Sequence, residues 1–129
     1  MTSKYNDRGN EDIREYITSS DGWTQLALVD DSDTIEAVLD IPAGSRLSWS
    51  PPSTTPITAS GDVSGGDSDI STPVEIAGTA LYSSDESPTA GESLGDTNPT
   101  HDDNFEGANV IIDSGDTVTI EHEIQQPEL

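Results

Sequence analysis

Two histidines and two neighbouring aspartates are the residues of this chain best suited to acid–base or metal chemistry. His101 opens the run His101-Asp102-Asp103, and His122 lies in an alternating segment near the C-terminus. Imidazole and carboxylate groups bind metals and transfer protons near neutral pH. His101 falls in a loop-like stretch, however, and His122 lies on the apolar face of a predicted strand. We therefore expect His122 to be a hydrogen-bonded core or interface residue, and we assign no catalytic residue.

A serine motif is the second chemical signal. Gly91-Glu-Ser93-Leu-Gly95 matches the Gly-x-Ser-x-Gly pattern of esterases, whose mechanism needs a strand before the serine and a helix after it. The flanking residues predict neither element, so we interpret the match as chance. No pair of carboxylates stands out for glycoside chemistry, and no phosphate loop or cofactor fingerprint appears. The sequence therefore predicts a protein that is not an enzyme.

Acidic turns suggest calcium, because hard cations take several oxygen ligands. The candidates are Asp30, Asp31 and Asp33 in one turn, and Asp67 and Asp69 in Gly65-Gly-Asp-Ser-Asp69. The second segment resembles half of a calcium-binding β-helix repeat, which has meaning only when it recurs. It occurs once, and no EF-hand spacing is present. Solvated surface carboxylates are the simpler interpretation. We expect no cofactor, and a structural Ca²⁺ or similar cation is the one alternative left open.

The charge of the chain limits its partners and its solvent. Twenty-six acidic residues against four basic ones give a net charge of −22 in 129 residues. Such a charge opposes compaction unless salt screens it, and the Debye length falls from about 8 Å at physiological salt to about 3 Å at 1 M. A disordered acidic tail is the alternative, but the acids are dispersed and the apolar residues alternate. The scarcity of lysine resembles the composition of extremely halophilic archaea, so we predict a folded, salt-adapted domain.

Other absences in the sequence narrow the class of protein. Clustered Lys and Arg are missing, which argues against nucleic acid as a partner. The chain has no cysteine, which excludes disulfides and thiolate metal sites. No signal peptide and no apolar run of the ~20 residues that span a bilayer are evident, so we expect no membrane insertion.

Residues 1–20 differ from the rest and are predicted to be an N-terminal arm or a short helix. Asn10 is placed to cap a helix over residues 11–17; an extended arm and a frayed terminus are the alternatives. The segment holds three of the four basic residues. If it docks on an acidic neighbour, the contacts are expected from Tyr5, Arg8, Ile13, Arg14, Tyr16 and Ile17.

Residues 21–129 are predicted to form an antiparallel β-sandwich or jelly-roll-like domain, because short alternating runs are separated by turn residues. Expected strands cover residues 23–29, 35–41, 47–49 and 74–82, and residues 109–112 and 117–124 form a hairpin in which Gly115 takes a positive φ. Residues 51–66 and 83–105 are expected to be long loops, the first with at most one weak strand. Gly78 indicates a bulge or a close approach. The core residues are expected to include Trp23, Leu39, Trp49, Ile76, Val118 and Ile120.

Gly22-Trp-Thr-Gln-Leu-Ala, the short strands and Pro/Ser/Thr loops that follow, and the turn Gly91-Glu-Ser-Leu94 resemble small β-sandwich structural proteins of tailed viruses. With the halophilic composition, the resemblance implies a virion protein of a haloarchaeal tailed virus, most simply a capsid decoration, cement or turret component. It implies the major capsid protein or another virion protein as partner, a trimeric or pentameric homo-oligomer, and a location in the virion after synthesis in the host cytoplasm. A tail or head–tail protein is the alternative within this class. A halophilic cell-surface or ligand-binding β domain with acidic cation-binding loops is the alternative outside it.

Overall fold

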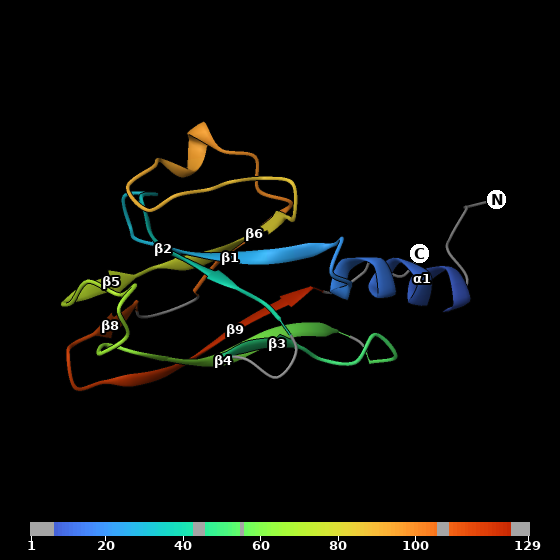
Figure 1. Ribbon diagram of the computed structural model, residues 1–129, viewed down its shortest axis with the longest axis horizontal. Coiled ribbons are helices and arrows are strands. Elements are labelled where there is room, and N and C mark those ends of the chain that lie inside the picture. Colours follow the sequence, from blue (N-terminus) through green and yellow to red (C-terminus); the bar gives the residue numbers. More distant parts are fainter. Residues whose placement is uncertain (1–6, 43–45, 55, 106–108, 125–129) are drawn as a thin grey trace.

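Two antiparallel sheets packed face to face form the body of the chain, in a computed structural model that describes residues 7–42, 46–54, 56–105 and 109–124 (Figure 1). The four-stranded sheet has the order β2-β1-β6-β7, with β1 at Trp23–Val29, β2 at Ile35–Asp40, β6 at Gly78–Ser83 and β7 at His101–Asn104. The three-stranded sheet has the order β3-β4-β9, with β3 at Leu47–Trp49, β4 at Ile57–Ser64 and β9 at Thr117–Ile124. The fold is thus the antiparallel β-sandwich that the sequence predicts.

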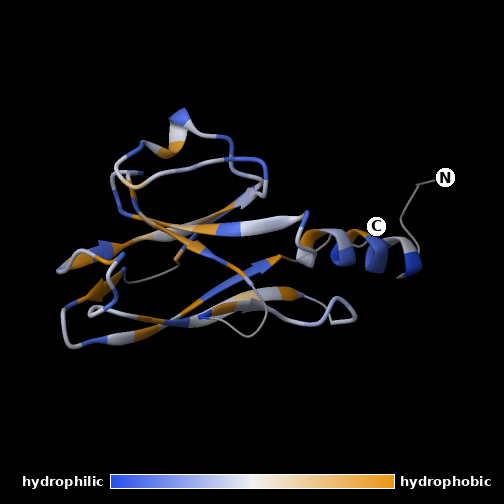
Figure 2. Cartoon of the chain, in the orientation of Figure 1, coloured by the Kyte–Doolittle hydropathy of each residue, from blue (hydrophilic) through white to orange (hydrophobic). Residues whose placement is uncertain are grey.

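The main core lies between these sheets, as the apolar segments of the strands in Figure 2 show. Leu26, Leu28 and Leu81 from one sheet pack against Leu47 and Ile120 from the other, and all are almost fully buried. Of the six expected core residues, Leu39, Ile76 and Ile120 are buried, and Trp23, Trp49 and Val118 are partly buried against this cluster. All six residues therefore lie in the main core or against it.

A second, smaller core covers the outer face of the four-stranded sheet. Ala27, Val29, Ile35, Ala80 and Tyr82 form this cluster, with Leu94 packed against it. Leu94 belongs to a 3₁₀ turn, η1 (Leu94–Asp96), in the long segment that follows β6. The Tyr82 hydroxyl and the Thr97 hydroxyl are hydrogen-bonded at 2.7 Å, which ties that segment down. The expected loop at 83–105 is therefore an additional layer over the sheet, and it ends in strand β7.

Local irregularities decide which face each side chain of β1 and β2 meets. The register shifts between Trp23 and Gln25 and again between Leu28 and Val29. Trp23 consequently packs against the main core while Ala27 and Val29 face the second core, although strict alternation would put all three side chains on one face. Ile35 likewise belongs to the second core although Leu39 lies in the first. A β-bulge has this effect because one extra residue inverts the alternation.

The segment predicted to be a loop over residues 51–66 contains β4, the central strand of the three-stranded sheet. Its apolar signal is weak because Ala59 and Gly61 occupy the inward positions between Ile57 and Val63. Small residues are required there. A Cβ on Gly61 would lie 1.7 Å from the Arg46 carbonyl oxygen, across the β3–β4 pair.

The chain also changes sheets in two places where the sequence predicts continuity. β5 (Val74–Ile76) pairs with β8 (Val110–Ile112) in a separate two-stranded sheet. A single residue separates β5 from β6, yet β6 belongs to the four-stranded sheet. The predicted hairpin is wrong for the same reason: β8 pairs with β5, and β9 pairs with β4. The turn at Asp113–Asp116 does form, but Gly115 has no positive φ. Gly78 is a site of close approach, as expected: a Cβ at this position would lie 2.3 Å from the Asp103 carbonyl oxygen.

A helix, α1 (Asp7–Thr18), precedes the sandwich and projects from one end of it (Figure 1). It begins before Asn10, which therefore lies inside the helix and does not cap it. Ile17 is only 4% exposed and belongs to the main core, and Ile13 packs against that core. The Arg14 guanidinium donates a hydrogen bond of 2.6 Å to the Pro52 carbonyl oxygen. One face of α1 is therefore part of the domain. No helix among the described residues is long and apolar enough to cross a membrane.

Glycine at position 61 is a requirement of the β3–β4 pairing that can be tested by substitution. Gly61→Ala forces a methyl group against the Arg46 backbone, so we expect a loss of about 1–3 kcal/mol in the free energy of unfolding, the usual range for overpacking. Urea denaturation in molar KCl measures it. Gly66→Ala is the matched control, since no atom lies within 4 Å of its Cβ position. Equal stability of the two variants would contradict this account of β4.

Candidate functional site

A chain of three polar side chains crosses the core between the two sheets. The Thr79 hydroxyl lies 2.7 Å from Nδ1 of His122, and Nε2 of His122 lies 2.7 Å from Nδ1 of His101. The two imidazole rings meet edge to face, with centroids 4.9 Å apart. Thr79 and His122 are buried, whereas His101 is half-buried. The chain of hydrogen bonds therefore leads from the interior to the surface.

The strand alternation places these side chains. His122 shares the inward face of β9 with Ile120 and Ile124, and its neighbours Glu121 and Glu123 point to solvent. Thr79 lies two residues before Leu81 on the inward face of β6, and His101 pairs with Leu81 at the start of β7. β7 and β9 are the edge strands of their sheets. The histidine pair therefore joins the sheets along one open side of the sandwich.

Burial determines the charge state of His122. The pKa of its imidazole falls from 6.5 to about 4, first because burial disfavours the cation and second because His101 repels a like charge, while Asp103 and Asp102 act weakly in the opposite direction. His122 is therefore neutral at pH 7. Either the Thr79 hydroxyl donates to His122 and His122 donates to His101, or the order of donation is reversed. Protonating both histidines would set two N–H donors against each other.

This arrangement resembles a proton relay, but its hydroxyl group is not accessible. The Thr79 hydroxyl is the innermost member, and the residue is 1% exposed. A metal ion between the histidines would need both lone pairs to converge on it, whereas the facing nitrogens are already in hydrogen-bond contact. The expectation that His122 is a satisfied core residue agrees with this geometry. The sequence grouped His101 with His122, but it gave no signal for Thr79, which lies 43 positions from His122.

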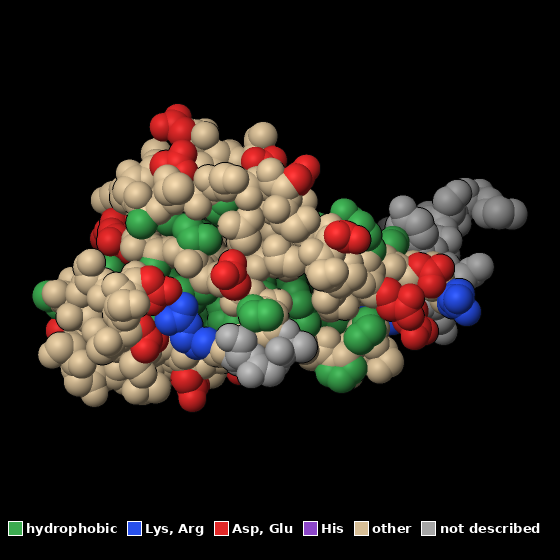
Figure 3. All heavy atoms as spheres, in the orientation of Figure 1, with side chains coloured by type: hydrophobic (Ala, Val, Ile, Leu, Met, Phe, Trp, Pro, Cys, Tyr) green, Lys and Arg blue, Asp and Glu red, His purple; other side chains and the backbone are tan. Residues whose placement is uncertain are grey.

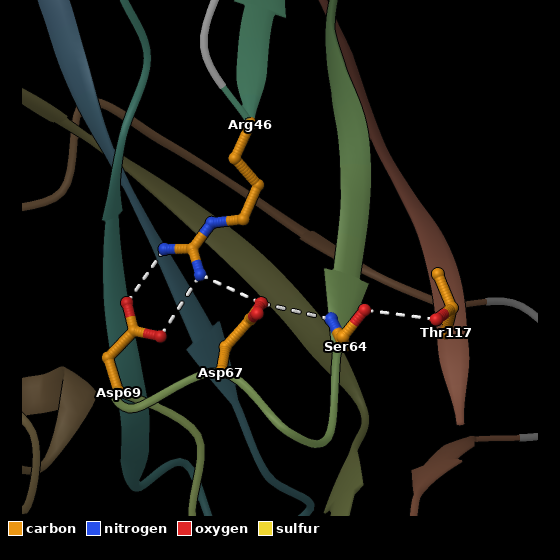
Figure 4. A network of polar contacts seen from close by, with 5 residues as sticks. All are labelled: Arg46, Ser64, Asp67, Asp69 and Thr117. Atoms are coloured by element: carbon orange, nitrogen blue, oxygen red, sulfur yellow. Dashed lines mark hydrogen bonds and ion pairs between the residues drawn. The ribbon is translucent and has the colours of Figure 1, made fainter. Parts of the chain in front are cut away.

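The acidic loop with Asp67 and Asp69 is occupied by an arginine. Nη1 and Nη2 of Arg46 donate to both oxygens of Asp69 at 3.0 and 2.7 Å, and Nη1 also lies 3.0 Å from Asp67 (Figure 4). Asp67 in turn accepts a hydrogen bond from the Ser64 backbone N–H at 3.0 Å, and the Ser64 hydroxyl lies 2.9 Å from the Thr117 hydroxyl. Hydrogen bonding to Arg46 lowers the pKa of the Asp69 carboxyl. These two carboxylates therefore hold the loop to β3.

The other calcium candidates lie in the turn between β1 and β2. Asp31 and Asp33 are exposed, and Asp33 has a φ of 59°. The turn is organised by Asp30, whose carboxylate accepts backbone hydrogen bonds from Ser32 and Thr34 at 2.9 Å. Within the described part of the chain, no three His, Asp or Glu side chains are grouped as metal ligands.

Asp30 and Glu36 form a carboxyl pair that the sequence did not single out. Their side chains share a hydrogen bond, which together with burial raises the pKa of Glu36 above its ordinary value. Burial alone would raise the pKa of Asp30, but hydrogen bonds from Glu36 and the Thr34 and Ser32 backbone lower it. Glycoside hydrolases hold their carboxyl groups about 5 Å or more apart, so two hydrogen-bonded carboxyls do not have that geometry.

The structure places the remaining candidate residues separately. Ser93 is exposed, bridges to Thr34 and precedes the three-residue turn η1, and thus lacks the strand and helix of a nucleophile elbow. Arg8 and Tyr16 are exposed on α1, whereas Ile13, Arg14 and Ile17 face the domain. Tyr5 lies outside the described residues.

Comparison with known proteins adds no relative: no family model, no curated protein and no solved structure matches the chain.

The low pKa of His122 predicts how stability depends on pH. His122 takes up a proton near pH 6.5 in the unfolded chain and only near pH 4 in the folded chain. The neutral histidine therefore contributes fully to the free energy of unfolding above pH 6.5, and that contribution is lost as pH falls from 6.5 to 4. The slope is at most about 1.4 kcal/mol per pH unit.

Urea denaturation in molar KCl at several pH values tests this, with His122→Gln as the comparison. The variant keeps a polar side chain but cannot titrate, so surface carboxylates affect both proteins and cancel in the difference. The stability advantage of the native chain should shrink as pH falls from 7 toward 4. Parallel curves would contradict the assignment.

Two arginine substitutions separate the ion pair at Arg46 from the effect of net charge. Arg46→Met and Arg8→Met each change the charge from −22 to −23. Arg8 contacts Asp12 at an exposed helix surface, and its side chain is 85% exposed, so no measurable loss is expected. Loss of Arg46 leaves Asp67 and Asp69 unpaired and should lower the free energy of unfolding by about 1 kcal/mol.

The Arg46→Met effect should grow as salt is removed, because the two carboxylates then repel each other with less screening. Thermal unfolding at low and molar KCl measures it. Equal effects at Arg8 and Arg46 would show that total charge alone matters.

Proposed function

We propose that this protein is a non-enzymatic structural subunit that assembles with other proteins at molar salt, specifically as a capsid decoration or cement component of a virion. The observation that carries the proposal is a folded sandwich whose acids are spread over the surface (Figure 3). No carboxylate among the described side chains is buried. Such a surface needs screening by salt. The resemblance of residues 22–95 to virion β-sandwich proteins supports the specific role.

The outer face of α1 is the proposed contact with the capsid. The helix is fixed to the domain by Ile13, Arg14 and Ile17, so its opposite face is held rigidly. That face exposes Tyr16, which is 55% exposed, together with Arg8. Tyrosine and arginine are enriched at the centres of protein interfaces. A rigidly held aromatic side chain suits an anchor in such a contact, and the ion pair of Arg8 with Asp12 supplies both charge signs beside it.

Binding to capsids tests the proposal. The full chain, purified in molar KCl, is mixed with particles of the major capsid protein encoded nearest its gene, and co-sedimentation is measured. Tyr16→Ala should weaken binding at least about tenfold, as expected for an aromatic anchor. Ile111→Ala is the matched control, because Ile111 is 58% exposed but lies on β8.

Three outcomes are informative. Loss of binding with Tyr16→Ala alone supports docking through α1. Equal effects of both substitutions would show that the capsid contact does not lie on α1. A chain that does not bind particles, and whose melting temperature rises with micromolar Ca²⁺ in molar salt, would instead indicate a cation-binding surface domain. Point substitution is preferred to deletion of residues 1–20, because deletion removes the buried Ile17.

A further inference from the structure

The outer edge of β9 is the longest strand edge that the described residues leave uncovered. β9 has eight residues and pairs with β4 along its whole length without a bulge. The other edges are shorter or protected. β3 has three residues, β7 has four and carries Asp102 and Asp103, and the start of β2 bonds to residues 91–94. Proteins commonly protect exposed edges with bulges, prolines or charged side chains. β9 has no bulge and no proline, and its only such protection is the charge of Glu121 and Glu123, which molar salt screens.

The hydrogen-bond pattern shows which backbone groups this edge presents. The Ser50 N–H donates to the Thr58 carbonyl, and the Gly65 N–H donates to the Asp116 carbonyl, both at 2.8 Å. Bonding alternates between neighbours along a strand, so Ile57, Ala59 and the other odd residues of β4 bond to β9. Their partners in β9 are the even residues. The N–H and C=O groups of Thr117, Thr119, Glu121 and Glu123 therefore point away from β4, and all four residues are exposed.

The exposed face of the β4–β9 pair follows a simple rule. Each carboxylate lies opposite a hydroxyl: Glu121 opposite Ser60, Glu123 opposite Thr58, and Asp62 opposite Thr119. The Thr119 hydroxyl donates to the Asp62 carboxylate at 2.8 Å. No carboxylate faces another across this pair. The rule avoids the like-charge contacts that destabilise sheets.

We propose that β9 pairs antiparallel with β9 of a second copy of this chain, about a two-fold axis at Ile120. In that register Thr119 lies opposite Glu121 of the second copy, and Thr117 lies opposite Glu123, so the acid–hydroxyl rule continues across the interface. These four residues of each copy carry the N–H and C=O groups that point away from β4. In this register they face one another, so each facing pair can exchange two backbone hydrogen bonds. A shift by two residues centres the axis on Glu121 or on Thr119. The first sets the two Glu121 carboxylates against each other, and the second leaves Glu123 opposite Gly115, outside the strand.

Charge makes the dimer dependent on salt. His101 contacts His122, so β7 with Asp102 and Asp103 lies along the same side of the sandwich as β9. Pairing through β9 brings the two copies of β7 toward each other. Their carboxylates repel unless salt screens them. The interface is isologous, so it produces a dimer rather than the trimer or pentamer that the sequence resemblance implies.

Light scattering after size exclusion in molar KCl tests the proposal with the full chain. We expect a mass twice the 13.6 kDa of the monomer, reverting to monomer as salt is lowered. Thr119→Pro should abolish the dimer, because proline removes an outward N–H and breaks no backbone hydrogen bond to β4. Thr119→Val, which loses only the side-chain bond to Asp62, is its control. Circular dichroism verifies that the variant folds. A monomer at every concentration in molar salt overturns the proposal.

Charge substitutions test the register independently of proline. Thr119→Glu sets Glu opposite Glu121 at two symmetric positions and should weaken the dimer about tenfold, whereas Thr119→Lys should strengthen it. Ser60→Glu is the matched control, because it adds the same charge to the same sheet face on the central strand. Equal weakening by Thr119→Glu and Ser60→Glu would overturn the proposed edge.

Cysteine cross-linking tests the same register directly, since the chain has no cysteine of its own. An equimolar mixture of Thr119→Cys and Glu121→Cys chains should form a disulfide-linked dimer under mild oxidation. Either variant alone should cross-link much less, because like positions lie too far apart for a disulfide. Cross-linking of Glu121→Cys with itself would overturn this register. A chain that dimerises but does not bind capsids leaves this inference intact and removes the proposed function.

Discussion

Mutual repulsion among carboxylates is the constraint on which the arrangement of this structure depends. A net charge of −22 favours expansion, and it is opposed by a core made mostly of Leu, Ile, Val and Ala between short strands. The described acids all reach solvent, and on the outer face of β4 and β9 each lies opposite a hydroxyl. Where two acids come close, the structure responds in one of two ways: Arg46 joins Asp67 and Asp69, and the pKa of Glu36 is raised beside Asp30.

Two of the arginines in the described part of the chain join segments that are distant in sequence. Arg46 lies where the loop after β4 returns toward β3, so its bonds to Asp67 and Asp69 fix a turn that two carboxylates alone would push outward. Arg14 lies on the inner face of α1 and bonds to the Pro52 carbonyl, which joins the helix to the segment between β3 and β4. Each of these arginines connects parts of the chain distant in sequence, as structural cations must when so few are available.

Strands with strict alternation and large apolar residues could be predicted from sequence, and strands made of small residues could not. Residues 35–40 and 117–124 show a clear period of two, whereas Ala59 and Gly61 conceal the central strand β4. The turn at Asp113–Asp116 was recognisable, but a turn does not specify which strand each arm pairs with. Side-chain partners were the hardest feature to predict, because Asp69 lies 23 residues from Arg46 and Thr79 lies 43 residues from His122. His122 itself could be predicted to be satisfied, because it occupies an inward position.

The buried histidine also explains why β9 has one register against the sandwich. Its inward positions alternate Ile120, His122 and Ile124, with Glu121 and Glu123 between them. A slip of one residue would turn the carboxylates into the core, which is costly for unpaired charges. A slip of two keeps the alternation but places isoleucine opposite Thr79 and His101, so that buried polar atoms lose their partners. The glutamates therefore exclude odd shifts and the histidine excludes even ones, so that β9 meets the core in a single register.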